Sequence, residues 1–391
     1  MTTLDHFDPT FTADPYTTWA AMRAEDPVWY WADLDSYMVV DHRIAREVLR
    51  DGDAFTLNRY AWEHFDPEAD EVERPLLGVT FEDGIFQAAP ADHARLRKLV
   101  VPTFSPAAAE RHRPLIQEVV DELVADWRPG DTVDLAAELA IVAPVRIISR
   151  LLGVDPSRDD WFLTMAADIA ALADPTAGPD VMDRAEVQLG HFKDLLESAG
   201  SDGLYGELLG LQEDGDRLSP TETFSLVVAL MTAGMETTAS AMSLGALALM
   251  AHPDQADLLR SEPERWPAAV VELLRYSYIG YGLTRFTTRQ VELGGHTIRK
   301  GQLIWINVGA ALHDPEVFPE PGRLDIGRPN AEAFPFGFGA HYCLGAALAK
   351  VEIECALRTL VDRFEGMRRV GDPSWRIHML LRGPSSLPVR L

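Results

Sequence analysis

Residues 336–350 read Phe-Gly-Phe-Gly-Ala-His-Tyr-Cys-Leu-Gly-Ala-Ala-Leu-Ala-Lys, and they constrain the architecture more tightly than any other part of the chain. The spacing predicts a tight loop that delivers one thiol, Cys343, to the start of a helix. Unpaired N–H groups and the helix dipole favour a thiolate there, and a thiolate is a strong metal ligand. Gly337, Gly339 and Gly345 would let a flat group lie against the loop. The alternative is a buried free cysteine, which is the commoner case for an isolated one.

The same residues resemble the haem-binding signature of the cytochrome P-450 family, Phe-Gly-x-Gly-x-His-x-Cys-x-Gly, at every specified position. Only Lys350 departs from the longer pattern, where an arginine is usual, and the positive charge is kept. The resemblance implies that Cys343 is the axial thiolate ligand of haem b iron, with Phe336 beside the sulfur. It also implies that His341 reaches a haem propionate and that Gly345 belongs to the cofactor-binding set. Thiolate ligation pushes electron density toward iron and favours O–O cleavage.

A long helix is predicted over residues 220–252. Ser219 and Glu222 form a capping box, and Pro220 occupies the first helical position. Between residues 225 and 251 the only charge is Glu236, so length and composition alone would allow a membrane span. Its sharp cap and polar centre favour a buried core helix instead.

The centre of this helix reads Ala233-Gly234-Met235-Glu236-Thr237-Thr238. Gly234 makes room for a cofactor, and the Thr237 hydroxyl can bond to the carbonyl of Ala233 and open the helix. The segment resembles the family's Ala/Gly-Gly-x-Asp/Glu-Thr pattern. The resemblance implies that Glu236 and Thr237 are catalytic and guide protons during dioxygen activation. Without it, such residues would more often be packing residues.

Three residues outside these segments are candidates for haem propionate binding. His93 and Arg97 lie four apart, on one predicted helical face. A surface pair would be the default, but the family carries His-x-x-x-Arg here and uses both side chains on haem propionates. Arg285 occupies the position of a third propionate partner. Buried carboxylates need such cations and donors around them.

The Glu-x-x-Arg sequence at Glu272 and Arg275 would, taken alone, be an exposed ion pair worth about 0.2–0.5 kcal/mol. The family buries this pair and adds an arginine from a loop before the cysteine, for which Arg328 is the match. The resemblance therefore implies a structural lock. Residues 279–283 and the C-terminal hairpin are expected to face the substrate.

The fold expected from the resemblance is mainly α with small β-sheets, with haem between the helix at 220–252 and the Cys343 loop. The 391 residues contain no linker, so a single domain over 1–391 is predicted. Val28–Trp31 and Tyr37–Val40 suggest a β-hairpin, and amphipathic helices are predicted at 112–127, 134–152, 158–173 and 181–199. Residues 55–91 show little periodicity and are either a binding lid or a solvated loop.

The formal net charge of −26 makes a nucleic-acid or anionic-membrane partner unlikely. A local excess of basic residues could nevertheless dock an acidic redox partner. These residues are Arg95, Arg97, Lys98, Arg111 and Arg113. The two cysteines, Cys343 and Cys355, would lie about 18 Å apart on a helix, too far for a disulfide. No N-terminal signal or anchor pattern is present, so a soluble, cytoplasmic protein is expected.

The resemblance predicts a haem-thiolate monooxygenase that uses dioxygen to oxidise, most simply to hydroxylate, a small organic molecule of specialised metabolism. No second cofactor motif is present, so a ferredoxin and its reductase are implied as electron donors. Leu230, Ala233 and Leu283 suggest a largely apolar substrate. The alternatives are oxidative coupling, desaturation or ring formation, and a haem-based sensor, which would need no proton relay. A zinc site at His341 and Cys343 lacks further nearby ligands.

Overall fold

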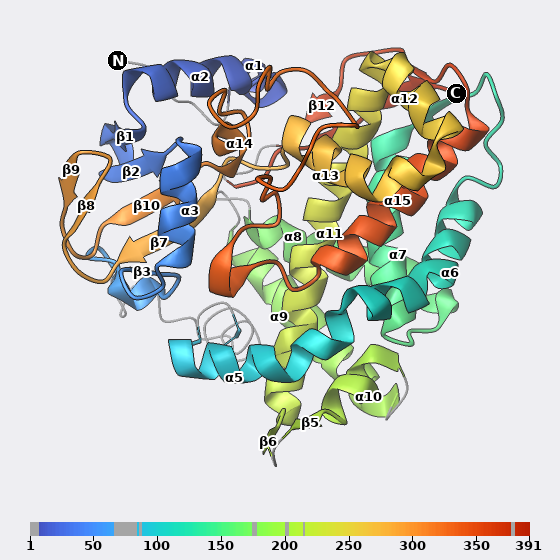
Figure 1. The fold of residues 1–391 in the computed structure, drawn as a ribbon. Coiled ribbons are helices and arrows are strands. Elements are labelled where there is room, and N and C mark those ends of the chain that lie inside the picture. The colour runs from blue at the N-terminus through green and yellow to red at the C-terminus, as the bar shows by residue number, and fades with distance from the viewer. Residues whose placement is uncertain are drawn as a thin grey trace.

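The computed structural model describes residues 8–65, 84–85, 88–173, 178–199, 203–213, 216–376 and 380–391. Helices form most of it and surround one long helix, α11 (Pro220–Ala251), while a small mixed sheet stands at one side (Figure 1). The prediction of a mainly α fold with small sheets is confirmed. The predicted lid or loop at 55–91 is only partly covered, because residues 66–83 and 86–87 lie outside the described ranges.

The remaining helices and the strands follow in chain order. The other α-helices are α1 (Pro9–Ala13), α2 (Tyr16–Glu25), α3 (His42–Arg50), α5 (Pro90–Val100), α6 (Pro106–Leu123), α7 (Val142–Leu151), α8 (Asp159–Ala170), α9 (Pro179–Ala199), α10 (Gly203–Leu209), α12 (Pro253–Ser261), α13 (Trp266–Tyr276), α14 (Val308–Ala311) and α15 (Ala346–Arg363). The strands are β1 (Val28–Trp31), β2 (Ser36–Val39), β3 (Phe55–Thr56), β4 (Thr132–Asp134), β5 (Gln212–Glu213), β6 (Asp216–Arg217), β7 (Leu283–Thr287), β8 (Val291–Leu293), β9 (His296–Ile298), β10 (Leu303–Ile306), β11 (Arg368–Arg369), β12 (Ser374–Trp375), β13 (Pro384–Ser386) and β14 (Pro388–Arg390).

The five-stranded sheet has the order β1-β2-β10-β7-β3. The predicted hairpin is confirmed, because β1 and β2 pair antiparallel with Val28 opposite Val39. Strand β10 then joins β2 in parallel and β7 antiparallel, which places Arg285 opposite Ile304. Segments that are distant in sequence are thereby brought together, so a side chain near residue 285 is positioned by the N-terminal strands.

Helix α11 begins with the predicted capping box. The Ser219 hydroxyl accepts from the Glu222 N–H, and the Glu222 carboxylate accepts from the Ser219 N–H. Within the described part of the chain, α11 is the one helix long and apolar enough to cross a membrane, but 67% of its most apolar window is buried inside the protein. It therefore serves as a core helix, packed against α7, α13 and α15 (Figure 1).

Two predicted helices have different bounds in the structure. The helix predicted at 112–127 begins earlier, because Ser105 caps it through the Ala108 N–H and Pro106 takes the first helical position. The helix predicted at 134–152 is divided into a short π-helical turn at 136–140 and then α7. The cap signal at Ser105 was present in the sequence and was overlooked.

The Glu-x-x-Arg pair is buried, as the resemblance implied. Arg275 donates to both carboxylate oxygens of Glu272, at 2.7 and 3.0 Å, and also to the carbonyls of Leu312, Pro321 and Arg323. Arg328 Nε donates to Glu272 Oε1 at 3.2 Å. One buried carboxylate therefore links α13 to the segment that leads into the cysteine loop, and the predicted lock is confirmed.

Candidate functional site

The cysteine loop has the tight form that its glycines predicted. The Cys343 N–H donates to the Phe336 carbonyl at 3.0 Å, which closes the loop just before α15. Gly337 and Gly339 have φ of +76° and +78°, a region that favours glycine. A Cβ on Gly339 would also lie 2.5 Å from the Leu49 carbonyl oxygen, so only glycine fits between this loop and α3. Lys350, the departure from the family pattern, places its Nζ 5.2 Å from the Phe336 ring centre.

Cys343 is accessible although the protein surrounds it. Its side chain is exposed, yet burial raises the pKa of its thiol, against the opposing effects of the Gly345 N–H, Arg97 and Lys350. The thiol is therefore accessible and at the same time largely surrounded by protein. Burial therefore opposes the thiolate that the helix start was expected to favour. A metal cation would supply the missing positive charge, since metal binding displaces the thiol proton.

Four basic residues gather beside this loop. The His93 and His341 rings lie 4.1 Å apart, centre to centre, and Arg97 Nη2 donates to the Tyr342 carbonyl at 2.6 Å. Arg285, on β7, is buried and donates to the neighbouring Thr284 carbonyl at 2.7 Å. The structure thus brings together the four side chains that the resemblance assigned to propionates, which come from α5, β7 and the loop.

The charges of this group are not compensated by the protein. Burial lowers the pKa of Arg285 to about 10 and that of His341 to about 4, and His93, Arg285 and Arg97 lower the latter further. Burial also lowers the pKa values of His93 and Arg97. Neither arginine pairs with a carboxylate anywhere in the described ranges. A bound group that carries carboxylates and places a metal at Cys343 fits this arrangement, and haem has both features.

The centre of α11 is open on one side. Ala233 is exposed, and Gly234, Glu236 and Thr237 are partly exposed, although Met231, Met235 and Thr238 are buried. A Cβ on Gly234 would lie 3.4 Å from Ile148 Cδ1, a tight contact with α7. Leu344, next to Cys343, packs against the apolar cluster that contains Met231 and Met235. The cysteine loop and the open part of α11 therefore share one apolar neighbourhood.

Thr237 makes the predicted hydrogen bond without the predicted opening of the helix. Its Oγ1 donates to the Ala233 carbonyl at 2.6 Å. Helix α11 nevertheless runs unbroken from Pro220 to Ala251. The expectation of a local opening is wrong, because a hydroxyl can share a carbonyl that still accepts its normal helical bond.

The sequence analysis missed a partner of Glu236. Arg376 Nη1 lies 3.4 Å from Glu236 Oε1, and both side chains are about one-fifth exposed, at 22% and 20%. The two residues are 140 positions apart, and no local pattern in the sequence connects them.

Glu352 on α15 was also missed. It is fully buried, and burial raises the pKa of its carboxyl to about 8.

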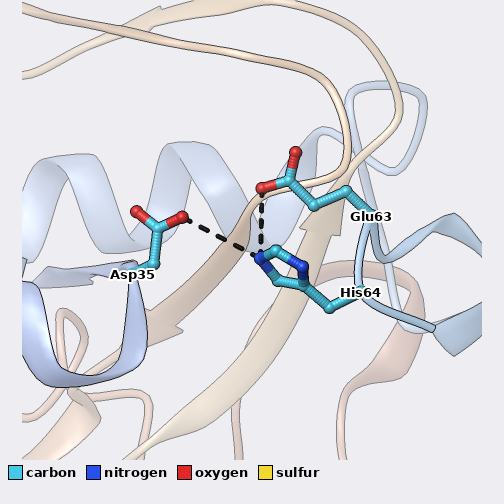
Figure 2. A group of neighbouring side chains, drawn as sticks. All are labelled: Asp35, Glu63 and His64. Carbon is cyan, nitrogen blue, oxygen red and sulfur yellow. Dashed lines mark ion pairs between the residues drawn. The ribbon is translucent and has the colours of Figure 1, made fainter.

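Asp35, Glu63 and His64 form a group with metal-ligand side chains on the sheet side of the molecule (Figure 2). His64 Nε2 lies 3.9 Å from Asp35 and 3.6 Å from Glu63. Arg299 already binds both carboxylates, at 3.0 and 2.7 Å. The Tyr30 hydroxyl and then Arg299 lower the pKa of Asp35, and Arg299 lowers that of Glu63. The group is therefore an exposed ion-pair junction. Within the described ranges, His341 and Cys343 belong to no group of three or more metal-ligand side chains.

Comparison with known proteins decides the family. A family model described as "Cytochrome P450" matches residues 191–373. The chain is 34% identical to cytochrome P450 107B1 of Saccharopolyspora erythraea, over 98% of this chain and 96% of that one. The chain belongs to the cytochrome P450 family. It is also 34% identical to the 6-deoxyerythronolide B hydroxylase of the same organism, over the whole of both. The structure of P450epoK with bound epothilone B superposes with a TM-score of 0.91 at 30% identity, covering 100% of this chain and 99% of that one.

This P450 is accordingly a monooxygenase that carries haem with a cysteine thiolate as axial ligand. It depends on redox partners and dioxygen and acts on small organic molecules. Both cysteines are free thiols, as predicted, but they differ in position. Cys343 is accessible beside the uncompensated cations, whereas Cys355 is buried within α15 and contacts Arg113 at 3.7 Å.

Proposed function

We propose that this cytochrome P450 inserts one oxygen atom, by hydroxylation, into a largely apolar small molecule of specialised metabolism, with all 391 residues forming one catalytic domain. The observation that carries the proposal is the accessible, desolvated thiol of Cys343 beside four basic residues without a carboxylate partner in the described chain. When bound, the haem supplies the centre at which dioxygen is reduced.

Individual residues have separate roles in this proposal. Cys343 ligates the iron as a thiolate, and Phe336, Gly345 and Gly234 shape the faces of the cofactor slot. The propionates are held by His93, Arg97, Arg285 and His341. Glu236 and Thr237 move protons from solvent to the oxygen-binding side. Their place in the open part of an otherwise buried helix supports this role, because water can reach them there.

The proposed substrate is largely apolar because apolar side chains are accessible on α11 and beside the cysteine loop. Leu230 and Leu283 are partly exposed and Ala233 is exposed. The names of the relatives, among them 6-deoxyerythronolide B hydroxylase and mycinamicin IV hydroxylase/epoxidase, refer to specialised metabolites. A natural-product library screened for substrate-induced shifts of the haem absorption band would identify the compound. Product analysis under labelled dioxygen then distinguishes hydroxylation, which gains the label, from coupling or desaturation, which does not.

We further propose that the protein is cytoplasmic and takes electrons from a ferredoxin, itself reduced by a ferredoxin reductase. The basic stretch contributes less charge to this surface than its sequence suggested. Arg95 is engaged by Glu222 and Asp216, and Arg113 by Glu110 and Glu354. Lys98 and Arg111 are both exposed, and Lys98 follows the residue that contacts the cysteine loop, so we centre the docking surface on these two residues.

Charge reversal tests this surface. Lys98→Glu and Arg111→Glu are expected to raise the ferredoxin concentration needed for half-maximal reduction, with the effect reduced at high salt. Arg368→Glu, on the exposed strand β11, is the matched control and is expected to leave that concentration unchanged. Equal effects of all three substitutions would show that net charge, and not this surface, controls docking.

A further inference from the structure

The C-terminal hairpin is fixed to α11 close to its catalytic centre. Strands β12 and β13 pair antiparallel, and the Arg376 N–H donates to the Gly383 carbonyl at 3.1 Å. A Cβ on Gly383 would lie 2.3 Å from Ser240 Oγ and 2.9 Å from Ser240 Cβ, so glycine is required there. Ser240 is buried on α11. The hairpin backbone therefore packs directly on Ser240 of α11.

This contact places Arg376 beside Glu236 of α11. Ser240 lies four residues after Glu236, which puts the two on the same face of the helix, one turn apart. Because Gly383 contacts Ser240 and also binds the Arg376 backbone, the Arg376 side chain reaches Glu236, with Nη1 3.4 Å from Oε1. The hairpin thus brings a cation to the carboxylate proposed to relay protons.

The contact differs from a structural ion pair. Arg275 donates two hydrogen bonds of 2.7 and 3.0 Å to Glu272, whereas Arg376 contacts Glu236 through one N–O distance of 3.4 Å. Arg376 Nε and Nη2 are buried and have no hydrogen-bond partner among the described residues. Arg382, on the same hairpin, is used structurally instead, since it donates to the backbone carbonyls of Thr12 and Ala13. The Arg376 guanidinium is therefore held close to Glu236 with donors to spare.

We propose that Arg376 is a positioning residue that orients the Glu236 carboxylate for proton delivery, and that the C-terminal hairpin controls this orientation. The inference rests on the proposed role of Glu236. A guanidinium held by a single contact can follow the carboxylate as it turns between solvent and Thr237. Its spare N–H groups can order water along that path.

Two measurements on the holoenzyme test the proposal. The first is a double-mutant cycle of Arg376→Gln and Glu236→Gln in urea unfolding, which measures the interaction without reference to turnover. We expect the double variant to be less destabilised than the sum of the single variants. The second measures product formed per NADH consumed, the solvent isotope effect on kcat, and the substrate-binding spectrum. Arg376→Gln is expected to lower coupling about tenfold and raise the isotope effect, with unchanged substrate binding.

Two control variants separate positioning of Glu236 from a purely structural role of Arg376. Arg376→Lys is expected to restore part of the coupling, and Arg369→Gln, an exposed arginine before the same hairpin, to change nothing. The inference is overturned if the destabilisation of the double variant equals the sum of the two single variants and Arg376→Gln keeps normal coupling. It is also overturned if the only defect of Arg376→Gln is weaker substrate binding. If Glu236→Gln itself leaves coupling and isotope effect unchanged, the proposed role of Glu236 fails instead.

Discussion

Replacing Glu272 by glutamine should destabilise this P450 far more than the same replacement in a nearly identical but exposed pair. Arg275 Nε lies 2.7 Å from Glu272 Oε2, and Arg265 Nε lies 2.6 Å from Glu262 Oε2, and both pairs are three residues apart. They differ in burial, because the side chains of the first pair are 0% and 1% exposed and those of the second 40% and 39%. The comparison therefore sets a buried, multiply bonded carboxylate against an exposed one with the same sequence spacing.

The magnitudes follow from that difference. Glu272→Gln leaves the Arg275 charge buried without its counter-charge, which costs about 3–5 kcal/mol. Glu262→Gln removes an exposed pair worth about 0–1 kcal/mol. At about 2.1 cal/mol/K per residue, a chain of 391 residues has an unfolding entropy near 0.8 kcal/mol/K. The expected fall in Tm is therefore about 4–6 °C for Glu272→Gln and about 1 °C or less for Glu262→Gln.

The assay is thermal unfolding of the two holoenzyme variants beside wild type, followed by far-UV circular dichroism and by the haem absorption band. Glu272 also accepts from Arg328 Nε and the Asp325 N–H, so the haem band should be lost together with the helical signal. Equal shifts for the two variants would refute the reasoning, since burial would then not control the strength of the pair.

Three further predictions concern the cysteine ligand, the proton relay and a buried carboxyl. Cys343→Ala should abolish the haem-thiolate spectrum, whereas Cys355→Ala should keep it, and the ferrous carbonyl spectrum of each variant checks this. Thr237→Ala should raise peroxide release at the expense of product, and Thr232→Ala, whose hydroxyl also bonds along α11, should not; unchanged coupling in the first variant would contradict the proton-relay role. Glu352 has a folded-state pKa of about 8, above its unfolded value, so its contribution to stability is full below about pH 4.5 and is lost as pH rises through 8. The glutamine in Glu352→Gln cannot ionise. Between those pH values, the unfolding free energy of the variant minus that of wild type should therefore rise by about 1.4 kcal/mol per pH unit, measured by urea unfolding. A difference that stays constant with pH would show that Glu352 does not titrate as its burial requires.

The cysteine loop and its surroundings show which features of the site could be predicted from neighbouring residues. The Phe336 to Gly345 loop and the capping box at Ser219 were both predicted, because each is built from neighbours within a few residues. The desolvation of Cys343 was not predicted, because it depends on how much protein surrounds the thiol. The helix start favours a thiolate, whereas the burial that raises the pKa of the thiol cannot be read from neighbouring residues.

By itself, the sequence indicated the family, the cysteine loop and the long core helix, since these motifs consist of neighbours along the chain. Through the resemblance it also suggested which side chains bind haem. Only the tertiary structure decided which charges remain uncompensated and which are paired. It placed Arg328 on Glu272 and Arg376 on Glu236, and it left Arg285 buried without an acid in the described chain. The physical reason is that an ion pair or a desolvated charge depends on distances of a few ångströms between segments far apart in sequence. Those distances are set by the packing of the whole fold.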